Sequence, residues 1–257
     1  QFIAITAAES GKEIRNVKFY DIAKKKYLTD SLPGMFAGFA PGTGNVYYLQ
    51  QPSWDVHVLV AEKDKSYKIH KLGTDTLQDK VFLSYQTNPE LYSPDNSASL
   101  WPVWLNISCN YEIINSGSVS PYVDVYYRKI NSTGAWKKII SVNDMVTNYF
   151  AKDNKLFLLS KKNAPNGKVL MMNTDRPDIA KATVLIQEKS IPMQSEISQS
   201  KNFLLIPYMK NGVLMNHQMI DMRTNKISKI PFPENTNLMY VTPFNMNNDD
   251  VHIVRMG

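Results

Sequence analysis

Four histidines are the side chains best suited to ligating a metal or transferring a proton: His57, His70, His217 and His252. Common zinc motifs place two ligands within a few residues of each other. No two of these histidines have that spacing, and each lies in or beside a segment of strand-like composition. A catalytic histidine would also need a nucleophile and an orienting carboxylate, and the sequence gives no sign of either. We therefore predict polar strand positions for all four, with no metal site and no cofactor.

Other reactive side chains fit turns and loops better than a catalytic site. Asp249 and Asp250 follow two asparagines, and Asp95 precedes another. Paired carboxylates can act as acid and base, but such Asn and Asp clusters are typical of turns. The run NSGSVS around Ser118 lacks the second glycine of a Gly-x-Ser-x-Gly nucleophile elbow. The single cysteine, Cys109, can form no internal disulfide and is interpreted as a passive thiol. No catalytic residue is assigned.

Aromatic, methionine and glycine residues could mark ligand sites, but packing and turns explain them. The run GTGN from Gly42 to Asn45 lacks the third glycine and the helix of a dinucleotide-binding loop, so we predict a hairpin turn. Four tryptophans could form a sugar-binding platform, yet they are scattered along the chain, so we predict packing between repeated units for Trp54, Trp101, Trp104 and Trp136. Five methionines are predicted to be core filler: Met171, Met172, Met215, Met219 and Met222.

Charge and hydropathy narrow the class of protein. The formal net charge is +6, but the densest basic run is Lys24–Lys26, which indicates a solvated turn and no nucleic-acid partner. No apolar run approaches the roughly 18 residues that span a bilayer, so no membrane insertion is expected. These features are typical of a soluble protein, and they leave its compartment, cytoplasmic or periplasmic, unknown. Because the first residue is Gln1 and not Met, we expect the chain to be trimmed or processed.

The elements that must carry these residues are short strands that recur at a regular interval. Strands preceded by a tight polar turn are predicted to start 47 to 56 residues apart, at Asn45, Leu100, Leu156, Phe203 and Val251. Each of the first four is followed by two more strands and preceded by a weaker candidate rich in small residues. In the second unit, for example, that weaker candidate is ELYSPD, Glu90–Asp95. This pattern gives four strands per unit.

A repeat of this length with four antiparallel strands indicates an all-β fold, the β-propeller of four-stranded antiparallel blades. A lone sheet cannot bury both faces, whereas neighbouring blades cover each other, so several units are required. Tyr67–Leu72 and Val81–Tyr85 are then predicted to be the two outer strands of one blade, joined by the polar stretch between them.

Counting units predicts one β-propeller segment over residues 1–257. Four complete blades are expected at about 35–87, 91–143, 147–188 and 194–232, with partial blades at 1–30 and 238–257. Partial blades leave unpaired strand edges, which favour self-association. The simplest reason for partial blades is that the chain is a piece of a longer polypeptide.

Three stretches resemble the propellers of the prolyl oligopeptidase family of serine peptidases. They are YKIHKLGTDTLQDKVFLSYQTNPE, NKLFLLSKKNAPNGKVLMMNTDRP and SKNFLLIPYMKNGVLMNHQMIDMRTNKISKIPFP. Their order and spacing agree with the family across nearly the whole chain. In that family an α/β-hydrolase domain sits over a seven-bladed propeller that restricts entry to short peptides.

The resemblance implies a non-catalytic propeller that filters short proline-containing peptides for an active site on the hydrolase domain of the parent polypeptide. This sequence contains neither a hydrolase segment nor seven blades, so we expect no cleavage by the chain alone, although the parent would be a serine-type endopeptidase. Two other functions stay open. One is a stand-alone propeller that binds a protein or a glycan. The other is an unrelated propeller enzyme such as a glycosidase, which would need carboxylates facing one pocket.

Overall fold

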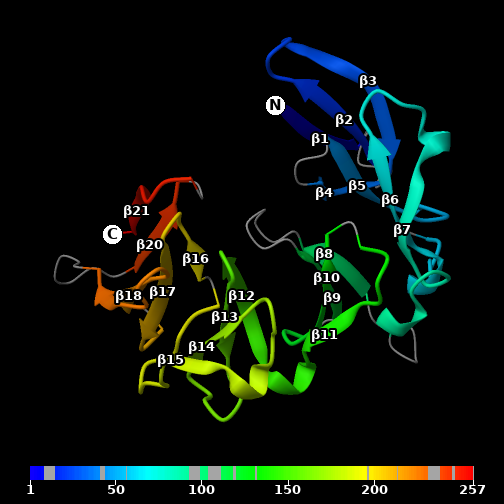
Figure 1. Cartoon of the computed structure of the whole chain (residues 1–257). Helices are drawn as coiled ribbons and strands as arrows, with labels where there is room; N and C mark the ends of the chain where they lie inside the picture. Colours follow the sequence, from blue (N-terminus) through cyan, green and yellow to red (C-terminus); the bar gives the residue numbers. More distant parts are fainter. Residues whose placement is uncertain are drawn as a thin grey trace. The chain divides into compact units, whose positions relative to one another are not determined.

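The computed structural model is built almost wholly from antiparallel strands (Figure 1). It describes residues 1–8, 15–40, 44–55, 57–92, 99–103, 111–117, 120–130, 132–195, 197–212, 214–230, 238–244 and 247–256. The chain divides into two compact units, residues 1–138 and 139–257. Each unit is described below by itself. No helix in the described part is long and apolar enough to cross a membrane.

The first unit contains a three-stranded sheet and two four-stranded sheets, and its boundary falls inside the last strand. The three-stranded sheet consists of β1 (Phe2–Ala8), β2 (Arg15–Asp21) and β3 (Lys26–Pro33). The next sheet consists of β4 (Met35–Phe39), β5 (Asn45–Gln50), β6 (Ser66–Lys71) and β7 (Lys80–Ser84). The third consists of β8 (Ser99–Val103), β9 (Tyr111–Gly117), β10 (Asp124–Lys129) and β11 (Lys137–Ile140).

The second unit contains two four-stranded sheets and a two-stranded one. The first sheet consists of β12 (Val146–Lys152), β13 (Lys155–Ser160), β14 (Lys168–Asn173) and β15 (Thr183–Ile186). The second consists of β16 (Ser198–Gln199), β17 (Phe203–Lys210), β18 (Leu214–Asp221) and β19 (Ile227–Lys229), and the pair consists of β20 (Leu238–Pro243) and β21 (Val251–Met256). Among the described residues, helical structure is limited to single 3-10 turns, η1 (Glu62–Asp64), η2 (Thr76–Gln78), η3 (Pro89–Leu91), η5 (Val142–Asp144) and η6 (Ile179–Lys181).

Turn residues explain why consecutive strands pair. Asp153 between β12 and β13 has φ 53°, and Asn211 and Gly212 between β17 and β18 have φ 54° and 72°. Positive φ in a tight hairpin loop gives the turn twist that matches antiparallel strands, and Asn, Asp and Gly adopt it at least cost. The polar clusters in the sequence therefore act as hairpin turns.

Central strands are buried on both faces, as the repeat requires. In β13 every residue from Leu156 to Ser160 is buried, and in β17 so is every residue from Leu204 to Tyr208. A sheet with one wet face would alternate buried and exposed positions. Each of these strands is therefore covered by neighbouring elements from two sides.

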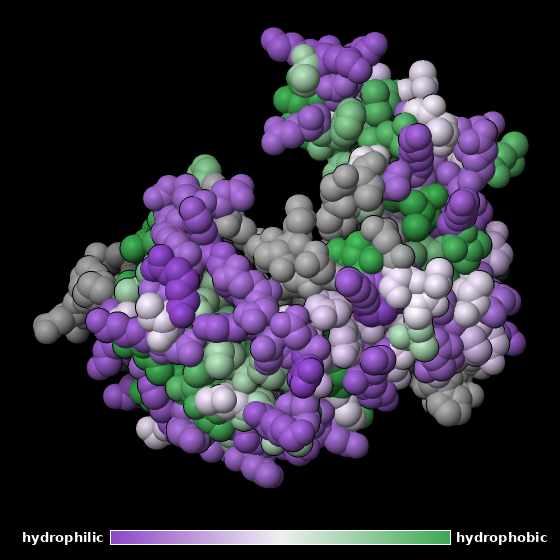
Figure 2. Space-filling model, viewed as in Figure 1, coloured by the Kyte–Doolittle hydropathy of each residue, from purple (hydrophilic) through white to green (hydrophobic). Residues whose placement is uncertain are grey.

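Hydrophobic clusters within each unit join one sheet to the next. In the first unit, Phe19 on β2 packs with Tyr48 on β5, and Leu83 on β7 packs with Ile114 on β9. In the second unit, one large cluster combines side chains of β13 and β14 with those of β17 and β18: Phe157, Leu159, Val169, Leu204, Ile206, Tyr208 and Ile220. Figure 2 shows hydrophilic residues over much of the visible surface of each unit, with hydrophobic side chains between them.

The predicted fold class is confirmed, and one strand assignment is wrong. Four four-stranded antiparallel sheets and two smaller ones are present, and β6 and β7 are the third and fourth strands of one sheet, as expected. In the second unit of the repeat, however, Glu90 and Leu91 lie in η3, and β8 is the first strand of its sheet. Pro89 starts that 3-10 turn, and the second strand is β9, which the repeat count missed. The single domain over residues 1–257 and its blade limits stay predictions.

Candidate functional site

His70 lies at the centre of a buried polar cluster in the first unit. Its ring Nδ1 is 2.8 Å from Asp79 Oδ1 and its Nε2 is 2.9 Å from Asp30 Oδ1. The His70 side chain is 0% exposed, and those of Asp30 and Asp79 are 2% and 1% exposed. Both ring nitrogens of His70 are therefore engaged by carboxylates.

The local structure around His70 supplies the other hydrogen bonds of the two carboxylates. β6 carries the histidine to the connection with β7, where Gly73 takes φ 88° and its N–H donates to Asp30 Oδ1 at 2.5 Å. The Tyr48 hydroxyl donates to Asp79 Oδ2 at 2.8 Å. Burial raises the pKa of Asp30, but hydrogen bonds from Gly73 and His70 outweigh it, so the net pKa lies below its ordinary value.

This cluster is suited to joining sheets and not to catalysis. Asp30 belongs to β3, His70 to β6, and Asp79 directly precedes β7, so the cluster ties the three-stranded sheet to the next one. A catalytic triad keeps one ring nitrogen free to take a proton from a nucleophile. Both nitrogens of His70 are instead committed to carboxylates, which leaves no general base here.

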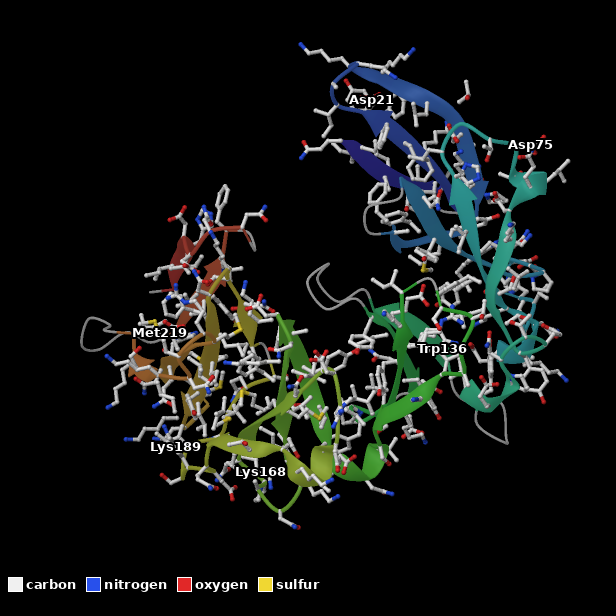
Figure 3. All side chains as sticks on the ribbon, viewed as in Figure 1. Asp21, Asp75, Trp136, Lys168, Lys189 and Met219 are labelled. Carbon is white, nitrogen blue, oxygen red and sulfur yellow. The ribbon has the colours of Figure 1, made fainter. Side chains whose placement is uncertain are left out.

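A partly buried charge in the first unit, that of Arg128, lies between two aromatic rings. Arg128 on β10 donates through Nε to Glu112 Oε2 at 2.6 Å, its cross-strand partner on β9. The guanidinium lies 4.3 Å from the ring centre of Trp136 and 5.3 Å from that of Phe82. Burial and the charge of Glu112 raise the pKa of Tyr47 to about 12, despite the opposing effect of Arg128. Because Phe82 belongs to β7, the stack joins the second and third sheets (Figure 3, Trp136).

The second unit contains a pocket of about 280 Å³ with a cationic rim. It is lined by residues of the loop after β15, of β17, β18 and β19, and of the segment just beyond β19: Lys189, Ile191, Tyr208, Asn216, His217, Gln218, Lys229 and Ile230. Lys189 Nζ donates to Gln218 Oε1 at 2.8 Å and lies 5.1 Å from the Tyr208 ring centre. Burial, and then the charge of Lys229, lower the pKa of Lys189. Two like charges therefore share this pocket.

The histidines lie on or beside strands but differ in burial. His57 is exposed in the loop after β5, and His252 is on β21 with its ring centre 5.0 Å from that of Phe244. His217 on β18 is buried, and burial lowers its pKa. No two of them meet, and the described residues contain no group of three or more His, Cys, Asp or Glu side chains able to hold a metal. The prediction missed the burial of His70 and its two partners, for which only the nearby Asp79 gave a local signal.

The turn assignments are confirmed where the structure describes them, whereas the packing assignments are confirmed only in part, since Met171 and Met219 are only partly buried. Asp249 accepts hydrogen bonds from the Ser200 hydroxyl and the Asn202 N–H, at 2.8 Å each, and joins the loop before β21 to the turn before β17. Asp250 accepts from Asn248, so the two carboxylates do not face each other. Trp136 packs in an inter-sheet cluster, while Trp54 is partly exposed in a loop. Three of the methionines are buried in the core: Met172, Met215 and Met222.

Several candidates lie outside the described residues. These are Gly42, Asp95, Trp104, Cys109 and Ser118. Trp101 lies on β8, but its side chain is outside the described part. The assignment of no catalytic residue therefore stays a prediction.

Comparison with known proteins gives one family and a consistent fold. Residues 1–252 match the family model of the prolyl oligopeptidase N-terminal beta-propeller domain. A prolyl endopeptidase structure is similar over 99% of this chain and 37% of its own, with TM-score 0.76 and 16% identity. Prolyl oligopeptidase B from Galerina marginata is similar over 100% and 37%, with TM-score 0.74 and 11% identity.

Oligopeptidase B from Leishmania major is similar over 93% of this chain and 33% of its own, with TM-score 0.66 and 16% identity. At such identities the structural similarity establishes the fold alone. The chain spans about a third of the length of these structures. No curated protein sequence matches it.

Proposed function

The chain belongs to the prolyl oligopeptidase N-terminal β-propeller family, and we propose that it is the non-catalytic, substrate-filtering part of a serine-type endopeptidase. Its partner would be an α/β-hydrolase domain of the same polypeptide, which carries the active site. Its substrates would be short proline-containing peptides, because a propeller beside the active site admits only chains that fit past it.

One observation carries this proposal: the family model covers residues 1–252, nearly the whole chain. The chemistry of the described residues agrees with a role outside catalysis. The buried ring of His70 has a carboxylate at each nitrogen, which leaves no nitrogen for a nucleophile. The geometry of the Asp30–His70–Asp79 cluster favours a rigid scaffold.

The proposal is tested by comparing substrates of two lengths in the parent enzyme. Cleavage of a short proline-containing peptide and of a long unfolded protein with the same cleavage sequence is measured with and without residues 1–257. We expect removal of the propeller to raise the long-to-short ratio of kcat/KM. An unchanged ratio, with the hydrolase domain still folded and active on the short peptide, would contradict the filtering role.

A further inference from the structure

The filtering function proposed above assigns no role to the pocket between β17, β18, β19 and the loop after β15. Its rim residues come from three neighbouring strands and one loop of the same unit (Figure 3, Lys189). Gln218 and Lys229 are paired across β18 and β19, so their side chains leave the same face of the sheet. Tyr208 reaches this face as well, because its cross-strand partner is two residues before Gln218. The register therefore brings these side chains together.

Asn216 and His217 also line the pocket, and its other polar side chains with nitrogen, Lys189, Gln218 and Lys229, supply donors. Gln218 Oε1 accepts from Lys189 Nζ at 2.8 Å and from the Tyr208 hydroxyl at 3.1 Å. Lysine can only donate, which fixes the amide with its oxygen toward these two groups. The amide NH₂ of Gln218 then has no acceptor among the described residues. Together with the ammonium groups of Lys189 and Lys229, it gives the pocket three N–H donor groups.

No negative charge balances these donors within the described lining. Neither Lys189 nor Lys229 forms an ion pair with a described residue, and no described lining residue carries a carboxylate. The charge of Lys229 disfavours the protonated form of Lys189 and so lowers the pKa of Lys189. Lysines that only keep a surface hydrated need not line the same pocket, as these two do. An anion between them would remove the repulsion and gain charge-assisted hydrogen bonds.

The remaining walls define what else the anion must carry. Tyr208 is buried and forms an aromatic floor, while Ile191 and Ile230 supply apolar surface. Ligand pockets usually measure about 300 to 1,000 Å³, so this one, at about 280 Å³, suits a small molecule. A bare inorganic ion would leave the apolar walls unused.

We propose that this pocket binds a small organic carboxylate. The carboxylate lies between Lys189 and Lys229 and accepts from Gln218, and the hydrocarbon part contacts Ile191 and Ile230. Binding is expected to be weak and salt-sensitive, because both lysines are open to solvent. The site depends on neither the hydrolase domain nor peptide cleavage.

The proposal is tested by titrating the 257-residue chain with three probes. N-acetylleucine carries both the charge and the apolar part, N-acetylleucinamide lacks the charge, and acetate lacks the apolar part. Backbone amide NMR shifts of Gln218, Lys229 and Ile191 are followed during each titration. We expect saturable binding of N-acetylleucine, with both controls weaker by roughly fivefold or more, the loss expected for one charged hydrogen bond or a few buried methylenes. Equal affinity for the amide or for acetate, or no saturation with N-acetylleucine, would overturn the proposal.

Matched lysine variants locate the site. Lys229→Gln and Lys189→Gln should each weaken N-acetylleucine binding by about five- to tenfold, in line with the loss of one charge-assisted hydrogen bond at a solvated site. Lys226→Gln removes the same charge three residues from Lys229, outside the pocket lining, and should leave affinity unchanged. If Lys226→Gln weakens binding as much as Lys229→Gln, the effect is general electrostatics and the proposal fails. Lys229→Arg, which restores the charge, should recover affinity and shows that the loss is not a folding defect.

Discussion

At the scale of single residues, His70 shows how a group suited to proton transfer can serve only as scaffold. The ring is fully buried, and each nitrogen faces a carboxylate at hydrogen-bond distance. The low dielectric around such a cluster strengthens every satisfied hydrogen bond and makes every unsatisfied one costly. The role of His70 therefore follows from its partners and not from its residue type.

Replacing His70 should strongly destabilise the first unit. His70→Ala leaves the buried carboxylates of Asp30 and Asp79 without the hydrogen-bond partner they share, which costs about 1 to 3 kcal/mol, and more for charged groups. Urea unfolding followed by tryptophan fluorescence measures this unit, because all four tryptophans lie within residues 1–138. The exposed His57→Ala should change the free energy of unfolding by less than about 0.5 kcal/mol. Equal effects of the two substitutions would show that the cluster contributes nothing.

Acid should lower the free energy of unfolding of the first unit, because Asp30 becomes protonated. The pKa of Asp30 is lowered in the folded protein, while an unfolded aspartate titrates near about 3.9. A carboxylate of this kind adds stability that is fully present above the unfolded pKa and is lost as the pH falls through the folded pKa. We expect the free energy of unfolding to drop as the pH is lowered from about 5 to below about 4, and to drop less steeply in Asp30→Asn. Parallel curves for the two proteins would contradict the assignment.

At the scale of elements, local signals were predictable and long-range pairings were not. Turn residues such as Asn211 and Gly212 act within their own hairpin, so the strand order of most sheets could be read from the sequence. The strand assignment in the second repeat was wrong because the polar sequence before Leu100 resembles the other predicted turns. The strand that follows it, β8, is the first strand of its sheet and not the second. Asp30 lies 40 residues before His70, and no local pattern points to that contact.

The burial of β13 on both faces can be used to test whether neighbouring elements cover both sides of a central strand. Leu158 and Leu159 point to opposite faces of that strand and are 0% and 2% exposed. Each Leu→Ala substitution should therefore cost about 2 to 5 kcal/mol, the usual range for buried leucine. Circular dichroism during urea unfolding measures both, and Val184→Ala, at a position 38% exposed on β15, is the control. A large loss at only one of the two leucines would mean that one face of the strand is not covered.

At the scale of the whole molecule, the described sheets within each unit cover one another through buried side chains. The three inter-sheet features of the first unit are the Asp30–His70–Asp79 cluster, the Arg128 stack and the hydrophobic clusters. All of them stabilise sheet against sheet within the described residues. A scaffold of this kind suits a domain that selects substrates for an active site elsewhere.

The most direct test of that claim is peptide turnover by the isolated 257-residue chain. The purified chain is incubated with a fluorogenic proline-containing peptide and, separately, with a fluorophosphonate probe that labels activated serines. We predict no turnover and no labelling. Turnover that persists through a second purification, together with labelling of a serine in this chain, would contradict a non-catalytic role.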